Sequence, residues 1–423
     1  MNRYNSYKDS GVKWVGEIPK HWKQIKLKHQ YKIQKGKIPK NLYDEYTDGL
    51  VPYLSMDVLR GSNSYNFTDL NDGVLVKKDE ILILWDGSNS GEIIKVEIDG
   101  ILSSTMGILN KTNNYLNNDF SFYQLKYNEP EIRNNTNGMG IPHVDGGYVR
   151  NLPIFVPPIH EQEQIVAYLD KKTAIVDTLI TSKEQKINLL KENRTALINH
   201  AITKGLDPNV KLKDSGVEWI GEIPAHWECK LLKYVSKITR GAILRPVDEP
   251  LYFDENGEWS YLNIADATIC DKYLTYSKLR LSELGSTKSA RVEPNNLIIT
   301  ASATIGKPFI NTIPVCVHDG FIPITELKIN IDFLFFYFKN PQLFNGLGKS
   351  NSQKNIYLDD VKNLLIPLPP NKEQEQIVEY LEKNTKEIDE LISLEQKKIV
   401  TLKEYRQALI SEVVTGKIKV VKD

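Results

Sequence analysis

The chain has 423 residues, which is more than one ordinary hydrophobic core accommodates and indicates two or three domains. Hydrophobic residues make up 41% of it and charged residues 26%, and no apolar run approaches 18 residues, so the composition excludes a membrane-spanning protein. The 54 lysines and arginines balance the 54 aspartates and glutamates, so net charge gives no support to nucleic-acid binding.

The amino-terminal segment MNRYNSYKDSGVKW has no apolar stretch of the kind found in secretion signals. The three cysteines, Cys229, Cys270 and Cys316, do not have the spacing of metal ligands. We therefore expect a cytoplasmic protein without structural zinc, whose thiols have no chemical role.

The segment DSGVKWVGEIPKHW at residues 9–22 recurs as DSGVEWIGEIPAHW at residues 214–227. We call this segment the strap. Trp14 and Trp22, together with a proline, predict a packed segment, and two glycines predict turns within it. A strap that is present twice indicates a duplicated architecture.

A lysine-rich segment, QIKLKHQYKIQKGKIPK, follows the first strap at residues 24–40 and contains six lysines and no carboxylate. Its local positive field would attract phosphate. The same composition is also typical of a solvated strand and loop, and composition alone does not separate the two interpretations.

The two halves of the chain also match in pattern through their middles. The matched segments are 32–36 with 237–241, 52–56 with 260–264, and 79–94 with 295–310. The last pair predicts a short buried strand followed by a turn that contains glycine or serine. Near-identity returns at residues 152–180, which recur at 364–392. The similar ends indicate a scaffold, and the divergent middles indicate two separately adapted surfaces.

Each similar end predicts a long helix. A pair of prolines closes an extended segment, and glutamates then occupy the first helical turn, where carboxylates suit the positive end of the helix dipole. One apolar heptad stripe comprises Val176, Ile180, Ile187, Leu190, Leu197 and Ala201, and the other comprises Ile388, Ile392, Ile399, Leu402, Leu409 and Val413. Charged residues interrupt the stripes at matching places, namely Lys183 and Arg194 in the first and Glu395 and Arg406 in the second.

A helix of about 40 residues is about 60 Å long and needs a partner for its apolar stripe. We expect the two helices to pair antiparallel and to hold the divergent middles at opposite ends of the pair. The alternative is that each helix only covers its own domain.

Several motifs in this order resemble the specificity subunit of type I restriction-modification systems. They are the GEIPxHW strap, the PPxxEQEQIVxYL helix start, and the closing LISEVVTGKI at residues 409–418, echoed as LINHAITKGL at 197–206. The resemblance spans essentially the whole chain. The first copy departs slightly, with TKGL where the second has TGKI, so the two partner contacts are not expected to be equal.

The resemblance implies an α+β fold with a pseudo-twofold internal repeat, in which two long antiparallel coiled-coil helices separate two α/β target recognition domains. The variable segments, about 24–150 and 229–362, would each bind one half of a split DNA sequence. The implied division is 1–150 for the first strap and recognition domain, 151–206 for the central helix, 207–362 for the second strap and recognition domain, and 363–423 for the last helix.

The resemblance also implies the partners, which are double-stranded DNA, two methyltransferase subunits docked on the helices, and restriction subunits that move along DNA. Members of the family have no catalytic centre. No cofactor is therefore expected in this chain, and S-adenosylmethionine, ATP and Mg²⁺ are expected on the partner subunits.

The residues support no catalytic site. The segment ASATIGKP at 301–308 lacks the first glycine of a phosphate-binding loop and has Pro308 where that loop needs serine or threonine. His21 and His226 lie in the straps without a metal-binding constellation around them, and packing beside tryptophan is the simpler role.

Candidate DNA-binding residues are basic, amide, hydroxyl and aromatic side chains near small-residue loops in the divergent middles, because such loops permit close approach to bases and phosphates. In the first middle they are Lys35, Lys37, Arg60, Asn63, Trp85, Ser88, Asn89 and Arg133. In the second they are Arg240, Arg245, Lys288, Arg291, Ser302, Thr304, Lys307, Gln353, Lys354 and Asn355. Lys35 and Arg240, each directly before a glycine, are the foremost candidates for phosphate contact.

Two other functions are compatible with the residues alone. The chain could be an adaptor that presents two diverged domains to protein ligands without binding DNA, which its neutral net charge allows. A nuclease is less well supported, because no acidic metal cluster or nucleophile constellation emerges from the sequence.

Overall fold

The computed structural model describes residues 3–62, 65–138, 140–302, 305–344 and 356–421. The chain forms two compact units. The first unit consists of Met1–Glu184 together with Lys397–Asp423, and the second consists of Gln185–Gln396. The carboxyl-terminal end of the chain therefore completes the first unit.

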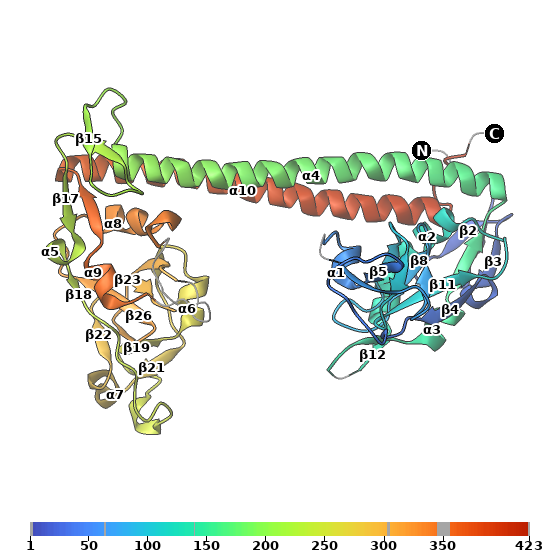
Figure 1. Cartoon of the computed structure of the whole chain (residues 1–423), viewed down its shortest axis with the longest axis horizontal. Coiled ribbons are helices and arrows are strands. Elements are labelled where there is room, and N and C mark those ends of the chain that lie inside the picture. Colours follow the sequence, from blue (N-terminus) through green and yellow to red (C-terminus); the bar gives the residue numbers. More distant parts are fainter. Residues whose placement is uncertain (1–2, 63–64, 139, 303–304, 345–355, 422–423) are drawn as a thin grey trace. The chain divides into compact units, whose positions relative to one another are not determined.

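The first unit is built around two β-sheets (Figure 1). One sheet has the order β4-β11-β8-β9, formed by Tyr31–Lys35, Met106–Lys111, Ile81–Leu84 and Ile93–Lys95, with antiparallel neighbours throughout. The other has the order β6-β5-β10-β7, formed by Asn66–Asp69, Leu50–Leu54, Gly100–Leu102 and Leu75–Val76, with β5 and β10 parallel.

The second unit repeats this topology with one additional strand, β20, which pairs parallel with β24 at the edge of the first sheet. Its first sheet has the order β18-β26-β23-β24-β20, formed by Lys237–Ile238, Phe321–Thr325, Asn296–Thr300, Pro308–Asn311 and Tyr273–Leu274. Its second has the order β21-β19-β25-β22, formed by Leu279–Leu281, Trp259–Leu262, Val315–Val317 and Ala290–Val292, with β19 and β25 parallel. The internal repeat thus extends through the middles, where few residues are identical.

The apolar strands predicted from residues 79–94 and 295–310 are β8 and β23. Both are buried on two faces. Ile81 and Ile83 of β8 belong to one hydrophobic core, whereas Leu82 and Leu84 belong to another. A strand covered on both sides has no polar face, which explains its unbroken apolar sequence.

Shorter elements complete both units. In the first unit they are the hairpin of β1 (Tyr7–Asp9) and β2 (Glu17–Pro19), the pair β3 (Lys23–Lys26) and β14 (Pro153–Val156), the pair β12 (Thr136–Asn137) and β13 (His143–Val144), and helices α1 (Met56–Leu59), α2 (Asn118–Asn134) and α3 (Gly146–Asn151). In the second unit they are β15 (Leu212–Asp214) with β16 (Glu222–Pro224), β17 (Glu228–Leu231) with β27 (Leu365–Leu368), and helices α5 (Leu232–Val235), α6 (Ile264–Ile269), α7 (Glu283–Thr287), α8 (Ile331–Phe338) and α9 (Leu358–Lys362).

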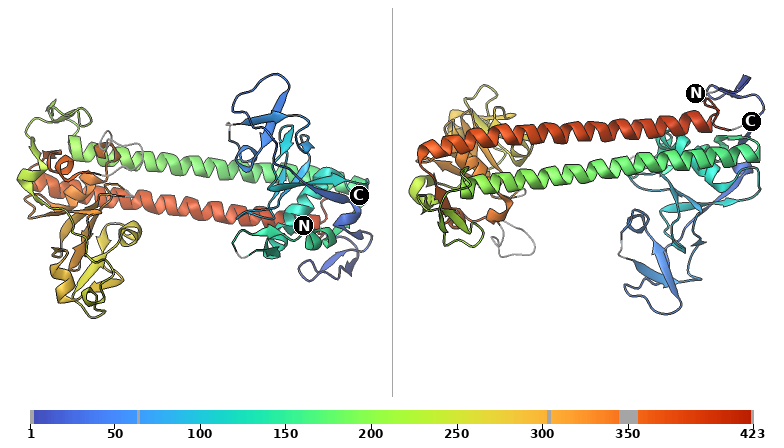
Figure 2. Two further views of the ribbon diagram at one scale, coloured as in Figure 1. Left: turned by 60° about the horizontal axis from the view of Figure 1, so that its bottom comes forward. Right: turned by 90° about the horizontal axis from the view of Figure 1, so that it is seen from above.

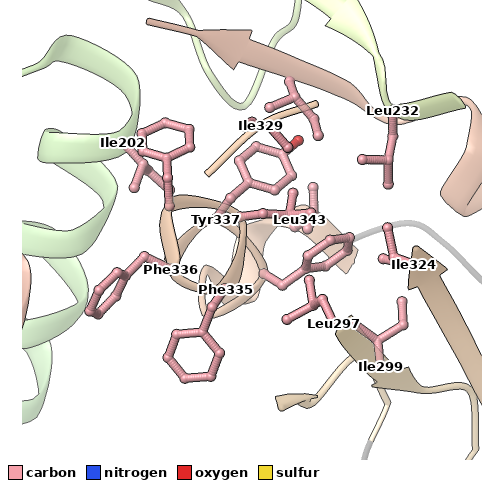
Figure 3. Packing of buried hydrophobic residues seen from close by; sticks show 14 of the residues in the cluster. Ile202, Leu232, Leu297, Ile299, Ile324, Ile329, Phe335, Phe336, Tyr337 and Leu343 are labelled. Carbon is pink, nitrogen blue, oxygen red and sulfur yellow. The ribbon is translucent and has the colours of Figure 1, made fainter. Parts of the chain in front are cut away.

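Helix α8 lies at the centre of the second unit's core (Figure 3). Its sequence, IDFLFFYF, is apolar on every side because the helix is enclosed by other elements. Phe336 and Tyr337 pack in one cluster with Ile202 of the long helix α4 and Leu297 of β23 (Figure 3). The Tyr337 hydroxyl donates to the Leu365 carbonyl at 2.8 Å, so the buried ring leaves no unsatisfied polar atom. The core therefore joins the sheet to the long helix.

The two long helices are α4 (Ile159–Lys204) and α10 (Asn371–Val414). In each unit a stretch of α4 lies beside a stretch of α10 (Figure 2). In the second unit, Lys186 contacts Glu395 at 2.9 Å and Arg194 contacts Asp389 at 2.9 Å. From one contact to the next, the residue number rises along α4 and falls along α10, so the pairing is antiparallel, as predicted.

The first unit contains the counterpart of one of these ion pairs. Arg406 donates to Asp177 at 2.9 Å, and these residues occupy the same repeat positions as Arg194 and Asp389. Three of the four charged residues that interrupt the stripes, Arg194, Glu395 and Arg406, therefore form ion pairs between the two helices. Glu395, almost fully buried, forms its ion pair with the more exposed Lys186, and a charge at such a position favours one register of the two helices over others.

The strap is a β-hairpin followed by a buried tryptophan. Gly11 and Gly16 turn the chain at φ of 67° and 75°, values that favour glycine. Trp22 and Trp227 have no exposed surface, as predicted for a packed strap. Trp14 differs from that prediction, because the residue is 39% exposed and its Nε1–H donates to Asn128 Oδ1 at the long distance of 3.4 Å.

The buried tryptophan of each strap contacts the start of one long helix and the end of the other. The Nε1–H of Trp22 donates to Glu161 at the start of α4. Its ring packs against Gly416 at the end of α10, where a Cβ would lie 3.1 Å from the ring. In the second unit, Trp227 donates to Glu373 at the start of α10 and packs against Gly205 at the end of α4. The duplicated sequence therefore encodes a duplicated junction between helices.

Candidate nucleic-acid interface

In the first unit a group of polar side chains lies where β4 and β8 end. Lys35 is the last residue of β4, and its Nζ lies 2.9 Å from Asp86 Oδ2 and 5.6 Å from the centre of the Trp85 ring. The N–H groups of Trp85 and Asp86 donate to the Thr105 carbonyl at 2.7 and 3.1 Å, which holds the loop after β8 against the turn before β11. The fold thus brings the predicted residues Lys35 and Trp85 together.

The pair of strands β12 and β13 borders the same group. Asp86 forms a β-bridge with His143, and the Gly87 N–H donates to the Pro142 carbonyl at 2.9 Å. His143 is exposed, as is Ser88 in the loop after β8. We call the group formed by Lys35, Trp85, Asp86, Ser88, Asn89 and His143 the first polar corner.

Gly36 is required for this arrangement. A Cβ at this position would lie 2.2 Å from the Ser103 carbonyl oxygen, closer than any side chain allows. The edge strand β4 can therefore end against the turn at residues 103–105 only with glycine there. The glycine that follows Lys35 therefore lets the end of β4 lie close to this turn.

The second unit has an equivalent second polar corner, which comprises Arg240, Ser302, His318 and Asp319. A Cβ at Gly241 would lie 1.9 Å from the His318 carbonyl oxygen, so the glycine after Arg240 makes the same close approach as Gly36. The Ala301 N–H donates to the Gly320 carbonyl at 2.7 Å, as the Trp85 N–H does to Thr105. Ala301 and Ser302 thus occupy the places of Trp85 and Asp86.

His318 is a fixed part of the second corner. Burial lowers the pKa of His318, although the Asp319 carboxylate 3.6 Å away raises it. The Nδ1 atom accepts the Gly320 N–H at 2.9 Å, which places the proton of the neutral ring on Nε2. Arg240 donates weakly to the Asp319 carbonyl, at 3.4 Å, and stays exposed. The guanidinium group therefore remains accessible to an anion.

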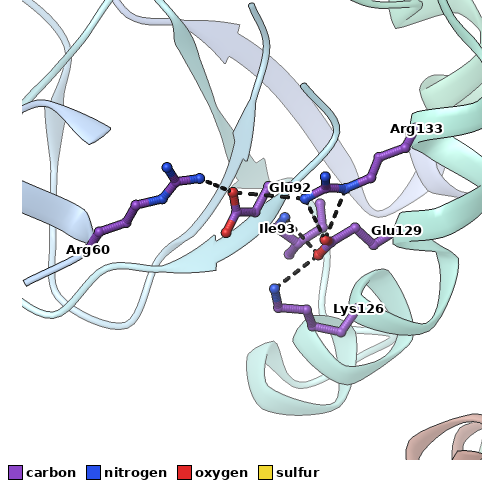
Figure 4. Close-up of polar contacts among 6 residues, drawn as sticks. All are labelled: Arg60, Glu92, Ile93, Lys126, Glu129 and Arg133. Carbon is purple, nitrogen blue, oxygen red and sulfur yellow. Dashed lines mark hydrogen bonds and ion pairs between the residues drawn. The ribbon is translucent and has the colours of Figure 1, made fainter. Parts of the chain in front are cut away.

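Two predicted residues of the first unit are engaged elsewhere (Figure 4). Arg60 donates to Glu92 at 2.7 Å, and Arg133 donates through two nitrogens to Glu129 at 3.2 and 2.9 Å. Glu129 also accepts from Lys126 and from the Ile93 N–H (Figure 4). Together these contacts join α1 and α2 to the segment at the start of β9. Arg60 and Arg133 therefore stabilise the first unit.

Two predicted residues of the second unit also have internal partners. Arg291 pairs with Glu283 and lies 5.0 Å from the centre of the Trp259 ring. Lys307 Nζ donates to the Thr268 carbonyl at 2.7 Å. Both side chains therefore hold the second unit's own elements together.

Three of the remaining candidates, Lys37, Arg245 and Lys288, are exposed, and Asn89 of the first polar corner is partly buried. Asn63, Thr304, Gln353, Lys354 and Asn355 lie outside the described residues.

Asp86, His143, His318 and Asp319 belong to the corners but are not among the residues predicted from the sequence. Asp86 follows Trp85 directly, and His318 and Asp319 precede a glycine. Polar residues next to a glycine at the end of an apolar strand would have been a usable signal. His143 gave no such signal, because it reaches the corner only through the pairing with Asp86.

Among the residues that the structure describes, no helix combines the length and apolar character that crossing a membrane requires. Within the same residues, no group of three or more His, Cys, Asp and Glu side chains could hold a metal ion. Burial raises the pKa of the Cys316 thiol to about 12, so this thiol stays protonated at neutral pH.

The fold and the two corners define a class of protein with two similar α/β units, each presenting a basic residue beside a polar turn, on a scaffold of two long helices. A family model for the type I restriction modification DNA specificity domain matches residues 19–191 and again residues 224–404. The chain belongs to the type I restriction-modification specificity subunits.

Individual relatives agree with this assignment. The type I restriction enzyme MjaVIII specificity subunit of Methanocaldococcus jannaschii is 30% identical over 434 residues, which cover 98% of this chain and 97% of that protein. The EcoBI specificity subunit of Escherichia coli is 23% identical over 89% of this chain and 81% of its own length.

Solved structures share the fold. The HsdS subunit from Thermoanaerobacter tengcongensis superposes with a TM-score of 0.51 at 17% identity, covering 97% of this chain and 100% of that one. A chain from a structure that describes complex assembly and conformational transition of the type I R-M system gives a TM-score of 0.71 at 17% identity, with 95% and 99% coverage. The predicted α+β fold with an internal repeat and long paired helices is confirmed.

Proposed function

We propose that each unit of this DNA specificity subunit binds one half of a bipartite target and that the helices dock methyltransferase subunits. One observation carries the proposal: in both units a basic residue and a buried glycine lie against a polar turn, at the end of edge strand β4 in the first unit and two residues past edge strand β18 in the second. We assign the recognition domains to residues 1–150 and 207–362, and the helical segments to 151–206 and 363–423.

The chemistry of the corners suits this role. Lys35 and Arg240 would contact phosphates, because their charged groups are exposed at matching places. The Lys35–Asp86 pair is exposed and worth at most about 1 kcal/mol, so a phosphate can replace Asp86 as the partner of the lysine at little cost. Asp86 can then accept from the amino groups of cytosine or adenine, whereas Ser302 can donate or accept. Asp86 and Ser302 occupy equivalent positions but differ in chemistry, so the two units would recognise different half-site sequences.

The helices would set the distance between the two half-sites, since a paired helix has a fixed rise per residue and a flexible linker does not. We further propose that the chain has no catalytic role and acts in the cytoplasm with two methyltransferase subunits and with restriction subunits. In that complex, the partner subunits bind S-adenosylmethionine, ATP and Mg²⁺.

A gel-shift assay with the co-expressed methyltransferase tests the proposal directly. The complex is expected to retard duplex DNA that carries the target sequence more strongly than a scrambled duplex. An adaptor for protein ligands would retard neither duplex.

Lys35→Ala or Arg240→Ala is expected to weaken DNA binding for every sequence and to flatten the dependence of log K on log salt concentration by about one unit, because one phosphate contact is lost. Affinities measured between low and moderate salt check this. Lys32→Ala and Lys237→Ala are matched controls, since these lysines lie three residues earlier along the same edges. A salt slope that falls equally in the controls, or in none of the four variants, contradicts the phosphate assignment.

Inserting seven residues into both long helices, after Glu184 and after Gln396, is expected to lengthen the accepted gap between half-sites by about three base pairs. Seven residues add about 10 Å of rise and keep the apolar stripe in phase, and one base pair occupies about 3.4 Å. The methylated sequences in a host expressing the variant report the gap. The half-sites themselves should not change, and an unaltered gap would refute a spacing role for the helices.

A further inference from the structure

In the first unit a tyrosine covers the contact of Trp22 and His21 with Glu161. We call this contact, and its counterpart in the second unit, the strap junction. The Glu161 carboxylate accepts from Trp22 Nε1 at 3.1 Å and from His21 Nε2 at 2.7 Å. The Tyr4 hydroxyl donates to the same carboxylate at 3.1 Å, and its ring centre lies 5.9 Å from that of Trp22. Tyr4 covers the junction so well that the Glu161 side chain is only 9% exposed.

The second unit has the same junction without the tyrosine. Glu373 accepts from Trp227 Nε1 at 2.8 Å and from His226 Nε2 at 2.7 Å. Counted from the matched strap residues, Asn209 takes the place of Tyr4, and it is exposed, with its backbone N–H donating to Asp207 Oδ1 at 2.9 Å. The Glu373 side chain is accordingly 36% exposed, four times as much as Glu161.

A pocket of about 550 Å³ occupies this place in the second unit. We call it the strap pocket. Leu206, Val210, Pro224 and Ile377 provide apolar walls, and His226 and Glu373 provide a polar end. Its volume lies within the range of roughly 300–1,000 Å³ that is typical of sites for small ligands or side chains.

We infer that the strap pocket receives a tyrosine side chain from the methyltransferase subunit, whose hydroxyl donates to Glu373 as Tyr4 donates to Glu161. The identity of the partner rests on the proposed function, whereas the chemistry of the occupant rests on the first unit. A carboxylate has about four acceptor sites, so Glu373 can take a third donor beside Trp227 and His226. Tyrosine is also enriched in protein interfaces, where its ring is buried and its hydroxyl is paired.

The inference makes the two docking sites unequal. In the first unit, the chain's own amino-terminal arm occupies the position that the strap pocket leaves open in the second. A partner that inserts a tyrosine can therefore do so at one unit only.

The isolated side chain is the first probe. p-Cresol, the side-chain analogue of tyrosine, is expected to bind the full chain once and to shift the Trp227 indole N–H signal in nitrogen-15 NMR spectra. Toluene, which lacks the hydroxyl, should bind about tenfold more weakly, because a hydrogen bond to a charged group is lost. Absence of a Trp227 shift, or equal binding of toluene, overturns the inference.

Substitutions are expected to close the site in the second unit or to open an equivalent site in the first. Asn209→Tyr is expected to close the strap pocket and to weaken p-cresol binding at least tenfold, whereas Asn209→Ala should bind like the wild type. Tyr4→Ala should open a second site that shifts the Trp22 indole signal, and Tyr4→Phe should leave that site closed. If the Asn209→Tyr variant binds p-cresol as tightly as the wild type does, the strap pocket is not the binding site and the inference is overturned.

The partner is tested by titrating the purified methyltransferase subunit into wild-type chain and Asn209→Tyr. One of two binding events is expected to weaken at least tenfold in the variant. If Asn209→Tyr rejects p-cresol but binds methyltransferase as the wild type does, the identity of the partner is overturned. If the wild-type chain binds p-cresol but does not bind the methyltransferase subunit, the proposed function is overturned. The methyltransferase is then also overturned as the source of the tyrosine.

Discussion

Trp22→Ala is expected to lower the free energy of unfolding of the first unit by about 3–5 kcal/mol, the usual cost of removing a fully buried tryptophan. The ring packs edge to face against Phe120, with 6.4 Å between ring centres, and its removal also leaves Glu161 without one of its donors. Calorimetry of the purified variant measures the loss. Because the ring contacts both long helices, α4 and α10 should separate at lower temperature.

Trp14→Ala is the matched control in the same strap. Its side chain is 39% exposed, so the loss should be at most about 1–2 kcal/mol. Equal losses in the two variants would show that the strap stabilises the unit through its hairpin and not through the tryptophan junction.

Gly241→Ala is expected to cost about 1–3 kcal/mol through overpacking and to impair DNA binding at the half-site of the second unit. The new methyl group would lie 1.9 Å from the His318 carbonyl oxygen, so the segment that follows β18 must move away from the turn at residues 318–320. Arg240 would move with this segment. Thermal unfolding measures the first effect, and binding to duplexes altered in one half-site at a time measures the second.

Gly140→Ala serves as the control, because a Cβ there meets no atom within 4 Å and the backbone does not have a positive φ. It should change neither stability nor recognition. Loss of both half-sites in Gly241→Ala would argue against separate recognition by the two units.

The correct predictions came from patterns that repeat or alternate along the chain. The duplicated strap, the two apolar stripes and the buried strands β8 and β23 each follow from the spacing of residues in the sequence. A basic residue before a glycine also recurs along the sequence, and the structure places Lys35 and Arg240 at equivalent positions, whereas their contact with phosphate stays a prediction. Such local regularities persist in the fold, since helix and strand periods determine which side chains share a face.

The internal partners of single charged residues do not follow from such local patterns. Arg60 and Arg133 have the right chemistry for DNA, but Glu92 and Glu129 hold them. Arg60 and Glu92 are 32 residues apart, so no local pattern indicates their contact. The same holds for His143, which reaches Asp86 through strand pairing.

The internal repeat, the long helices and the family membership follow from order and spacing along one chain, so the residues alone were enough to establish them. The accessible basic side chains, the packing of Gly36 and Gly241 against turns more than 60 residues away, and the site that Tyr4 fills beside Glu161 but that is open beside Glu373 became visible only in the folded chain. Accessibility and close approach depend on atoms distant in sequence, which meet only when sheets, straps and helices pack together.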